Sequence, residues 1–220
     1  MTNIQGCIFD LDGVIVDTAK YHYKAWRKLA NHLGFDFGEE ENEQLKGVGR
    51  MESLGVILGI GGITRTEIEM QELAAMKNEW YVEMISGMDS SELLPGALEF
   101  LKALQQADIK IALGSASKNA PRILDSTGIT HYFQAVIDGS KTSRGKPDPQ
   151  IFELGAEGLG LHPSECVVFE DAAKGVQAAK DGGFHCVGVG DARSLAQADL
   201  IIEGMHEMTI EMLDKFAPVG

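Results

Sequence analysis

Two aspartates near the N-terminus have a spacing that can bring both carboxylates to the same side of a strand. Asp10 and Asp12 follow the apolar run 6–9, which predicts a buried parallel strand. Residues two apart on an extended chain face the same way, so both carboxylates can point into one cavity at the strand's carboxyl end, where ligands of open α/β sheets bind. Gly13 permits a sharp turn that lets backbone N–H groups approach an anion. In isolation, the same residues also suit an ordinary polar turn.

Three later segments contain residues suited to binding phosphate or a cation. Ser115 lies in the run 114–119, between a predicted strand and a predicted helix, where a hydroxyl and exposed amides make an anion site. Lys146 follows a polar loop, and Glu170 and Asp171 come directly after a predicted strand. Carboxylates, water and phosphate oxygens are the ligands that Mg²⁺ prefers. Taken singly, these residues also suit a helix cap, a solvated lysine and an acidic turn.

The order of the four segments is more specific than any one of them. The run Asp10-x-Asp12-Gly13-x-x-x-Asp17-Thr18 resembles the first signature of the haloacid dehalogenase superfamily of phosphoryl-transfer enzymes. The other three segments match its second, third and fourth motifs in the expected order. The resemblance implies that Asp10 is the nucleophile and that Asp12 is the general acid and base.

The same resemblance assigns roles to the remaining motif residues. Ser115 is expected to hold the transferring phosphoryl group, and Lys146 to neutralise its oxygens, which lowers the repulsion that an attacking carboxylate meets. One Mg²⁺ ion is expected in an environment formed by Asp10, the backbone carbonyl of Asp12, Glu170 and Asp171.

The elements that must position these residues alternate between strand and helix after residue 95. The apolar runs predict strands at 109–113, 135–137, 166–169, 186–189 and 200–202, and the intervening patterns predict helices beginning at 95, 121, 148 and 173. Such alternation predicts a doubly wound parallel sheet, a Rossmann-like core of the α/β class.

A mostly helical block of about 75 residues separates the first strand from this alternation, far more than a crossover helix requires. Asp17 and Thr18 can cap its first helix, and Thr64-x-x-Glu67 predicts a capping box that opens a long helix. That helix is expected to present Leu73, Met76, Trp80 and Met84 on one face. The block resembles the small α-helical cap of the superfamily, which implies a core domain at 1–16 and 92–220 and a cap domain at 17–91.

Two segments of the cap and one loop of the core resemble the regions in which mutases of the superfamily differ from phosphatases. Asp-Thr-x-x-x-His ending at His22, Leu-Lys-Gly-Val-x-Arg ending at Arg50, and Ser-Ala-Ser-Lys-Asn ending at Asn119 together resemble the sugar-phosphate mutases of the superfamily. The resemblance implies that His22 positions Asp12 and that Thr18 lies at the hinge. The other expected substrate contacts are Lys46 and Gly47 at the sugar, Ser115 and Ala116 in the core loop, and Arg50, Ser117, Lys118 and Asn119 at the non-reacting phosphate.

The expected activity is therefore an intramolecular phosphoryl transfer of the isomerase class. The resemblance implies that β-D-glucose 1-phosphate and D-glucose 6-phosphate interconvert through an aspartyl phosphate, with β-glucose 1,6-bisphosphate as activator and intermediate. A sugar-phosphate phosphatase on the same fold remains an alternative, because the core motifs alone do not separate the two. A non-catalytic binding protein is a further alternative.

The charge and composition of the chain argue against several classes of binding partner. The net charge of −14 argues against nucleic acid and anionic membranes, and no run approaches eighteen apolar residues. The N-terminus lacks a basic segment followed by an apolar one, and the three cysteines lack Cys-x-x-Cys spacing. We therefore expect a cytoplasmic enzyme with buried free cysteines and small-molecule sugar phosphates as partners, and, by the habit of the family, a monomer.

Three residues depart from the pattern expected of relatives. Gly49 and Gly114 stand where serine and alanine are expected, and Ala172 stands where a serine often follows the acidic pair. These differences affect loops and hydrogen bonds around the motifs, while every core catalytic position is occupied.

Overall fold

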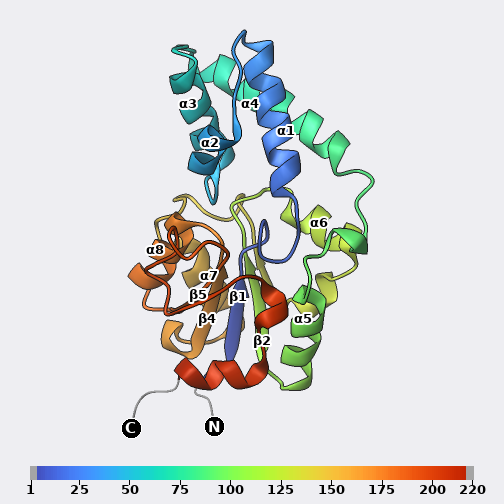
Figure 1. Cartoon of the computed structure of the whole chain (residues 1–220), viewed down its shortest axis with the longest axis vertical. Helices are drawn as coiled ribbons and strands as arrows, with labels where there is room; N and C mark the ends of the chain where they lie inside the picture. The colour runs from blue at the N-terminus through green and yellow to red at the C-terminus, as the bar shows by residue number, and fades with distance from the viewer. Residues whose placement is uncertain (1–3, 217–220) are drawn as a thin grey trace.

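The computed structural model describes residues 4–216, and a six-stranded parallel sheet lies at its centre (Figure 1). The strand order is β3-β2-β1-β4-β5-β6, so the order reverses beside β1. The strands are β1 (Gly6–Phe9), β2 (Lys110–Gly114), β3 (Ala135–Ile137), β4 (Cys166–Glu170), β5 (His185–Val189) and β6 (Leu200–Ile202). This topology confirms the predicted doubly wound α/β sheet and places the carboxyl end of β1 at the switch point where such sheets bind ligands.

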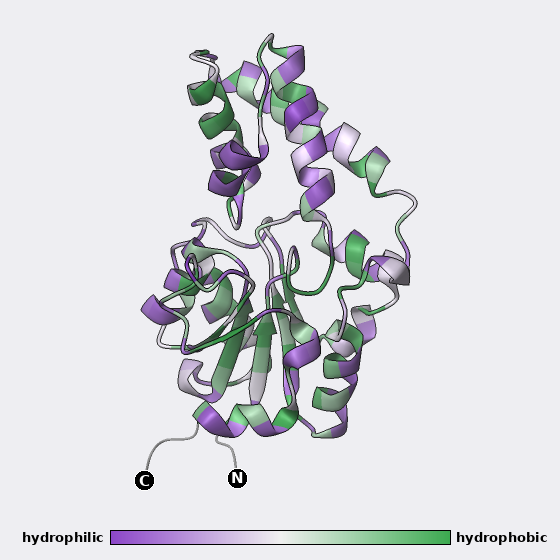
Figure 2. Ribbon diagram, viewed as in Figure 1, coloured by the Kyte–Doolittle hydropathy of each residue, from purple (hydrophilic) through white to green (hydrophobic). Residues whose placement is uncertain are grey.

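Helices cover both faces of the sheet because the central strands are apolar on both sides. Cys7 and Phe9 of β1 belong to one hydrophobic cluster, and Ile8 belongs to the other. Helices α5 (Ala97–Gln106) and α6 (Ala120–Thr127) complete the first cluster, and α7 (Gln150–Leu159) and α8 (Ala173–Asp181) complete the second. Figure 2 shows the resulting hydrophobic strands between amphipathic helices.

The helical block following β1 has a hydrophobic cluster of its own. It comprises α1 (Ala19–His32), α2 (Glu39–Asn42), α3 (Arg50–Ile60) and α4 (Glu67–Met84), which lie beyond the carboxyl ends of the strands (Figure 1). Trp26, Leu54 and Leu73 are among its buried residues. The assignment of residues 17–91 to a separate cap domain stays a prediction.

Short 3₁₀ turns join the longer elements. They are η1 (Glu43–Leu45), η2 (Ser90–Glu92), η3 (Thr130–Tyr132), η4 (Pro163–Glu165), η5 (Met205–Glu207) and η6 (Ile210–Phe216). The helix expected from Pro95 begins instead at Ala97, because Gly96 adopts a left-handed conformation with φ of 84°. A side chain at Gly96 would collide with the backbone of His206.

Two expectations about α4 name the wrong residues, those for its capping box and those for its buried face. The capping box is formed by Thr66 and Glu69, two residues later than predicted, because the sequence offers two overlapping Thr-x-x-Glu patterns and the helix begins at Glu67. The predicted apolar face is also rotated. The residues of α4 that are buried are Leu73, Ala74, Lys77 and Tyr81, whereas Met76, Trp80 and Met84 are half-buried.

Among the described residues, no helix is long and apolar enough to cross a membrane. Cys7, Cys166 and Cys186 are all free thiols in the core, as expected.

Candidate active site

The sheet brings the predicted motifs together at one edge. Phe9, at the end of β1, pairs with Leu113 of β2 on one side and Phe169 of β4 on the other. The residues that follow these strand positions, Asp10, Ser115 and Glu170, therefore converge although they are far apart in the sequence. Asp10 and Asp12 line one pocket, as the i, i+2 spacing predicts.

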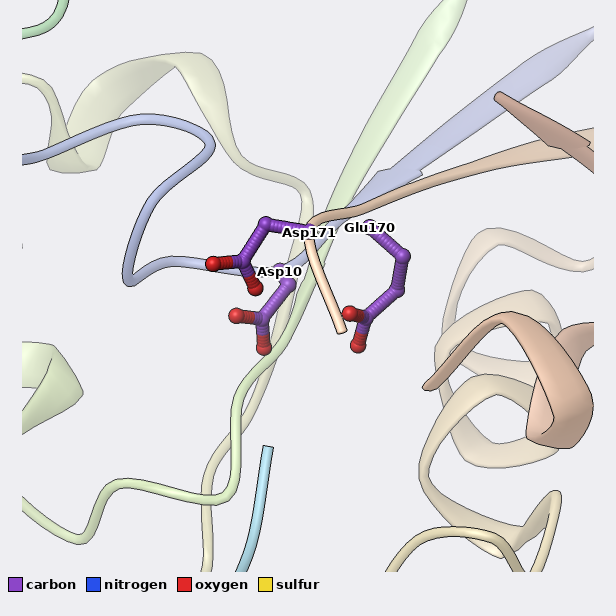
Figure 3. Close-up of side chains that lie close together, drawn as sticks. All are labelled: Asp10, Glu170 and Asp171. Carbon is purple, nitrogen blue, oxygen red and sulfur yellow. The ribbon is translucent and has the colours of Figure 1, made fainter. Parts of the chain in front are cut away.

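Three carboxylates form a group that fits a divalent cation. Asp10, Glu170 and Asp171 each offer an oxygen, and these oxygens all lie within 4.8 Å of one another (Figure 3). Burial, followed by the charges of Glu170 and Asp10, raises the pKa of Asp171 well above its ordinary value. A hard cation would relieve this accumulation of negative charge, and an all-oxygen donor set suits one. The side chain of Asp12 is not part of this group.

Lys146 is a buried cation between two of these carboxylates. Its Nζ atom lies 2.7 Å from Oδ1 of Asp10 and also forms an ion pair with Glu170, and its side chain is fully buried. Burial alone would lower the pKa of Lys146, but the two carboxylates outweigh it and raise the pKa. The lysine therefore remains charged beside Asp10.

Asp12 has the electrostatics of a group that can hold a proton near neutrality. Removal from water, followed by the charge of Asp10, raises its pKa to about 7, while Lys146 and Lys77 oppose the shift. The hydroxyl of Thr18 donates a hydrogen bond to Oδ1 of Asp12. This contact corrects the predicted cap: Thr18 precedes α1, but its side-chain oxygen accepts no bond from that helix. The backbone of Thr18 is helical, with φ of −95° and ψ of −10°, rather than extended as in a capping residue, and its hydroxyl is directed at Asp12.

Residues of the helical block and of the core line the same pocket. The predicted residues among its lining are Asp10, Asp12, His22, Lys46, Gly47, Arg50, Ala116, Ser117, Lys118, Asn119 and Asp171. Thr18, Ser115, Lys146 and Glu170 are buried immediately behind this lining. The side-chain amide of Asn119 donates to Oδ1 of Asn78 in α4 at 3.0 Å, which joins the core loop to the helical block.

Lys77 is a residue of this pocket that sequence reasoning missed. Its Nζ lies 3.0 Å from Nδ1 of His22 and 4.4 Å from the centroid of the Trp26 ring, and only 2% of the residue is exposed. Burial, followed by the charge of Arg50, lowers the pKa of Lys77 to about 7, and burial followed by Lys77 lowers the pKa of His22. The available signal was a lysine at helical spacing from Leu73 and Tyr81, on an otherwise apolar face.

Comparison with known proteins gives the family. The family model of the haloacid dehalogenase-like hydrolases matches residues 4–183. The chain belongs to this haloacid dehalogenase-like family.

Within the haloacid dehalogenase-like family, the chain is similar both to a mutase and to phosphatases. It is 42% identical to the β-phosphoglucomutase of Bacillus subtilis over 96% of this chain and 94% of that one. It is 34% identical to the fructose-1-phosphate phosphatase YqaB of Escherichia coli over 84% of this chain and 95% of that one. The crystal structure of a β-phosphoglucomutase from Clostridium difficile superposes with a TM-score of 0.94 at 41% identity, covering 97% and 96% of the two chains.

Proposed function

We propose that this chain is a β-phosphoglucomutase, which interconverts β-D-glucose 1-phosphate and D-glucose 6-phosphate. One observation supports the proposal: a single pocket is lined both by Asp10 and Asp171 of the carboxylate group and by Arg50, Lys118 and Asn119, whose side chains suit a second phosphate. A mutase needs two phosphate-binding regions, because its bisphosphate intermediate has a phosphate at each end of the sugar.

In the proposed reaction, an oxygen of Asp10 attacks phosphorus while the bond from phosphorus to the sugar oxygen breaks, which leaves an aspartyl phosphate. Lys146 offsets the negative charge that the attack brings together. Asp12 gives its proton to the departing sugar oxygen, and in the return step takes the proton of the attacking hydroxyl. A pKa of about 7 suits a group that must do both.

We propose Mg²⁺ as the cation of the carboxylate group, held by Asp10, the Asp12 carbonyl, Glu170 and Asp171. When bound, it supplies charge neutralisation for the transferring phosphoryl group. Its chemistry agrees with the all-oxygen donor set of three carboxylates that lie close together.

The distal phosphate is assigned to Arg50, Ser117, Lys118 and Asn119, the sugar to Lys46 and Gly47, and the transferring phosphoryl group to Ser115 and Ala116. In this proposal β-glucose 1,6-bisphosphate is both the intermediate and the activator, since it phosphorylates Asp10 when the enzyme begins a cycle.

The helices of residues 17–91 are proposed as a cap that closes on the core, 1–16 and 92–220, and excludes water from the aspartyl phosphate. Exclusion favours transfer to a sugar hydroxyl over hydrolysis, and binding of the distal phosphate favours closure. We further propose that the protein acts in the cytoplasm as a monomer on small sugar phosphates.

A sugar-phosphate phosphatase is the second candidate, supported by the similarity to the Escherichia coli phosphatase. Incubation with Mg²⁺, β-glucose 1-phosphate and a trace of the bisphosphate distinguishes the two. A mutase gives glucose 6-phosphate as the main product, whereas a phosphatase releases inorganic phosphate. Asp10→Asn and metal chelation are the controls, and turnover that survives either one contradicts the proposal. Fluoroberyllate, which imitates an acyl phosphate, should bind to the wild type only if the protein is catalytic.

A further inference from the structure

One buried hydroxyl in α4 stands out. Tyr81 is 0% exposed, and its hydroxyl oxygen is the single buried side-chain polar atom of residues 4–216 without a hydrogen-bond partner. Leaving a buried donor unsatisfied costs free energy, and phenylalanine would fill the same space without that cost. A tyrosine at this position therefore requires an explanation other than packing.

The surroundings of Tyr81 point to the acid–base end of the pocket. Its ring lies against the ring of His22, with centroids 4.1 Å apart and planes inclined by 31°. The ammonium group of Lys77 is 4.8 Å from its ring centroid. Thr18 and Asp12 are close enough to its hydroxyl to influence the pKa of Tyr81. The residue thus lies directly behind the group that handles the proton, without lining the pocket itself.

The hydroxyl of Thr18 offers the missing acceptor. A threonine hydroxyl has one hydrogen and two lone pairs, and Thr18 already donates its hydrogen to Asp12. Its lone pairs remain free to accept, while Tyr81 has a hydrogen to give. Burial, followed by the charge of Asp12, raises the pKa of Tyr81, so its hydroxyl keeps that hydrogen.

We propose that Tyr81 is a positioning residue for Asp12, a role that rests on the proposed mutase function. Its hydroxyl donates to the oxygen of Thr18, which fixes the threonine hydrogen on Asp12 and holds that carboxyl toward the sugar oxygen. Tyr81 belongs to α4 and Asp12 to the loop after β1. These hydrogen bonds, which form a relay, therefore orient the Asp12 carboxyl only when the helical block contacts the core.

Tyr81→Phe removes the hydroxyl and nothing else, so it is the central test. With Mg²⁺, β-glucose 1-phosphate and a trace of bisphosphate, we expect kcat to fall about 5- to 10-fold, the loss expected for one neutral hydrogen bond, with KM changing less than about twofold. The thermal midpoint should change little, because the loss of one hydrogen bond is offset by the removal of a buried polar group.

A second phosphoryl donor, acetyl phosphate, distinguishes a loss of Asp12 positioning from a general loss of structure. Its acetate leaving group needs no proton, so the single-turnover rate at which it phosphorylates Asp10 should be the same in Tyr81→Phe and the wild type. An equal loss with both phosphoryl donors would indicate a structural role and overturn the proposal. So would wild-type kcat on the sugar phosphate.

Two further variants complete the experiment. Tyr23→Phe removes another tyrosine hydroxyl of the helical block, which lies 3.5 Å from the carbonyl of Phe37, and should leave kcat unchanged. In a Thr18→Val background, Tyr81→Phe should have no additional effect, and an additive loss would contradict the relay. If the wild type releases only inorganic phosphate, the mutase function fails, yet the comparison of the two phosphoryl donors still tests Tyr81.

Discussion

Lys146 illustrates how much of the site depends on single buried charges. Its fully buried ammonium group compensates the negative charges of Asp10 and Glu170. The residue is therefore both a proposed participant in phosphoryl transfer and a structural counter-ion, and the two roles can be separated by measuring stability rather than activity.

We expect Lys146→Met to lower the free energy of unfolding by about 3–5 kcal/mol without metal, because it leaves buried carboxylates uncompensated. Millimolar Mg²⁺ should then stabilise the variant more than it stabilises the wild type, since the ion replaces the lost charge. Urea denaturation of both proteins with EDTA and with Mg²⁺ measures this. If metal stabilises neither protein, there is no cation site at these carboxylates, and equal stabilisation would contradict the view that the ion replaces the charge of Lys146.

The lowered pKa of Lys77 predicts how the stability of the protein depends on pH. Its pKa is about 7 in the folded protein, against an ordinary value of 10.5, so unfolding takes up a proton between these values and stability due to Lys77 rises with pH there. From pH 7 to 8.5, the wild type should gain about 1.5 kcal/mol relative to Lys77→Met, measured by urea denaturation. Below pH 7, Lys77 is protonated in both the folded and the unfolded wild type. It should therefore add no difference there between the pH dependence of the wild type and that of Lys77→Met. A parallel response between pH 7 and 8.5 would show that the pKa of Lys77 is not shifted.

At the scale of elements, the sequence predicted the strands and helices that show a clear hydrophobic periodicity, and the polar residues that follow the strand ends. The β1–β2–β4 neighbourhood follows from apolar runs and right-handed crossovers, and it was enough to expect Asp10, Ser115 and Glu170 at one edge. The rotation of α4 was not predictable in the same way. Its buried face includes Lys77 and the hydroxyl of Tyr81, which no hydrophobic pattern would select.

The side-chain cap predicted at Thr18 for α1 is wrong for a related reason. Thr18 has the residue type of a helix cap, but tertiary contact redirects its hydroxyl to Asp12. Local propensity gave the position of the helix, and only the assembled loop determines where that side chain points.

The two unexpected glycines should have opposite effects when the expected residues are restored. Gly49 precedes α3 with extended backbone and has open space where a side chain would project, so Gly49→Ser should add a helix cap and stabilise by about 0.3–1 kcal/mol. A Cβ at Gly114 would lie 2.9 Å from Cδ1 of the buried Phe152, so Gly114→Ala should destabilise by about 1–3 kcal/mol. Urea midpoints measure both, and the same sign for both variants would contradict these packing arguments.

At the scale of the molecule, the helical block and the core share buried contacts, since Ala25 and Tyr81 belong to the hydrophobic cluster of the sheet, and polar contacts add to them. Glu52 of α3 and Lys174 of α8 form an ion pair of 2.9 Å between residues 122 apart in the chain. Asn78 and Asn119 form another polar contact, beside the pocket. The charge pair lies outside the proposed chemistry, so it is suited to testing whether seating of the helical block on the core limits turnover.

Both side chains of that ion pair are partly exposed, 50% for Glu52 and 42% for Lys174. The pair should therefore stabilise the contact between the helical block and the core by about 0.2–1 kcal/mol, and salt should screen this attraction. Glu52→Lys should therefore lower kcat/KM by about 1.5- to 5-fold at low ionic strength, because two positive groups then oppose closure. Lys174→Glu should have a similar effect, and the double exchange should restore activity. The defect of each single variant should shrink in about 0.5 M NaCl, where the screening length is roughly half a nanometre. If the double exchange is no better than the single variants, the pair does not contribute to seating, and closure must depend on the contacts inside the pocket.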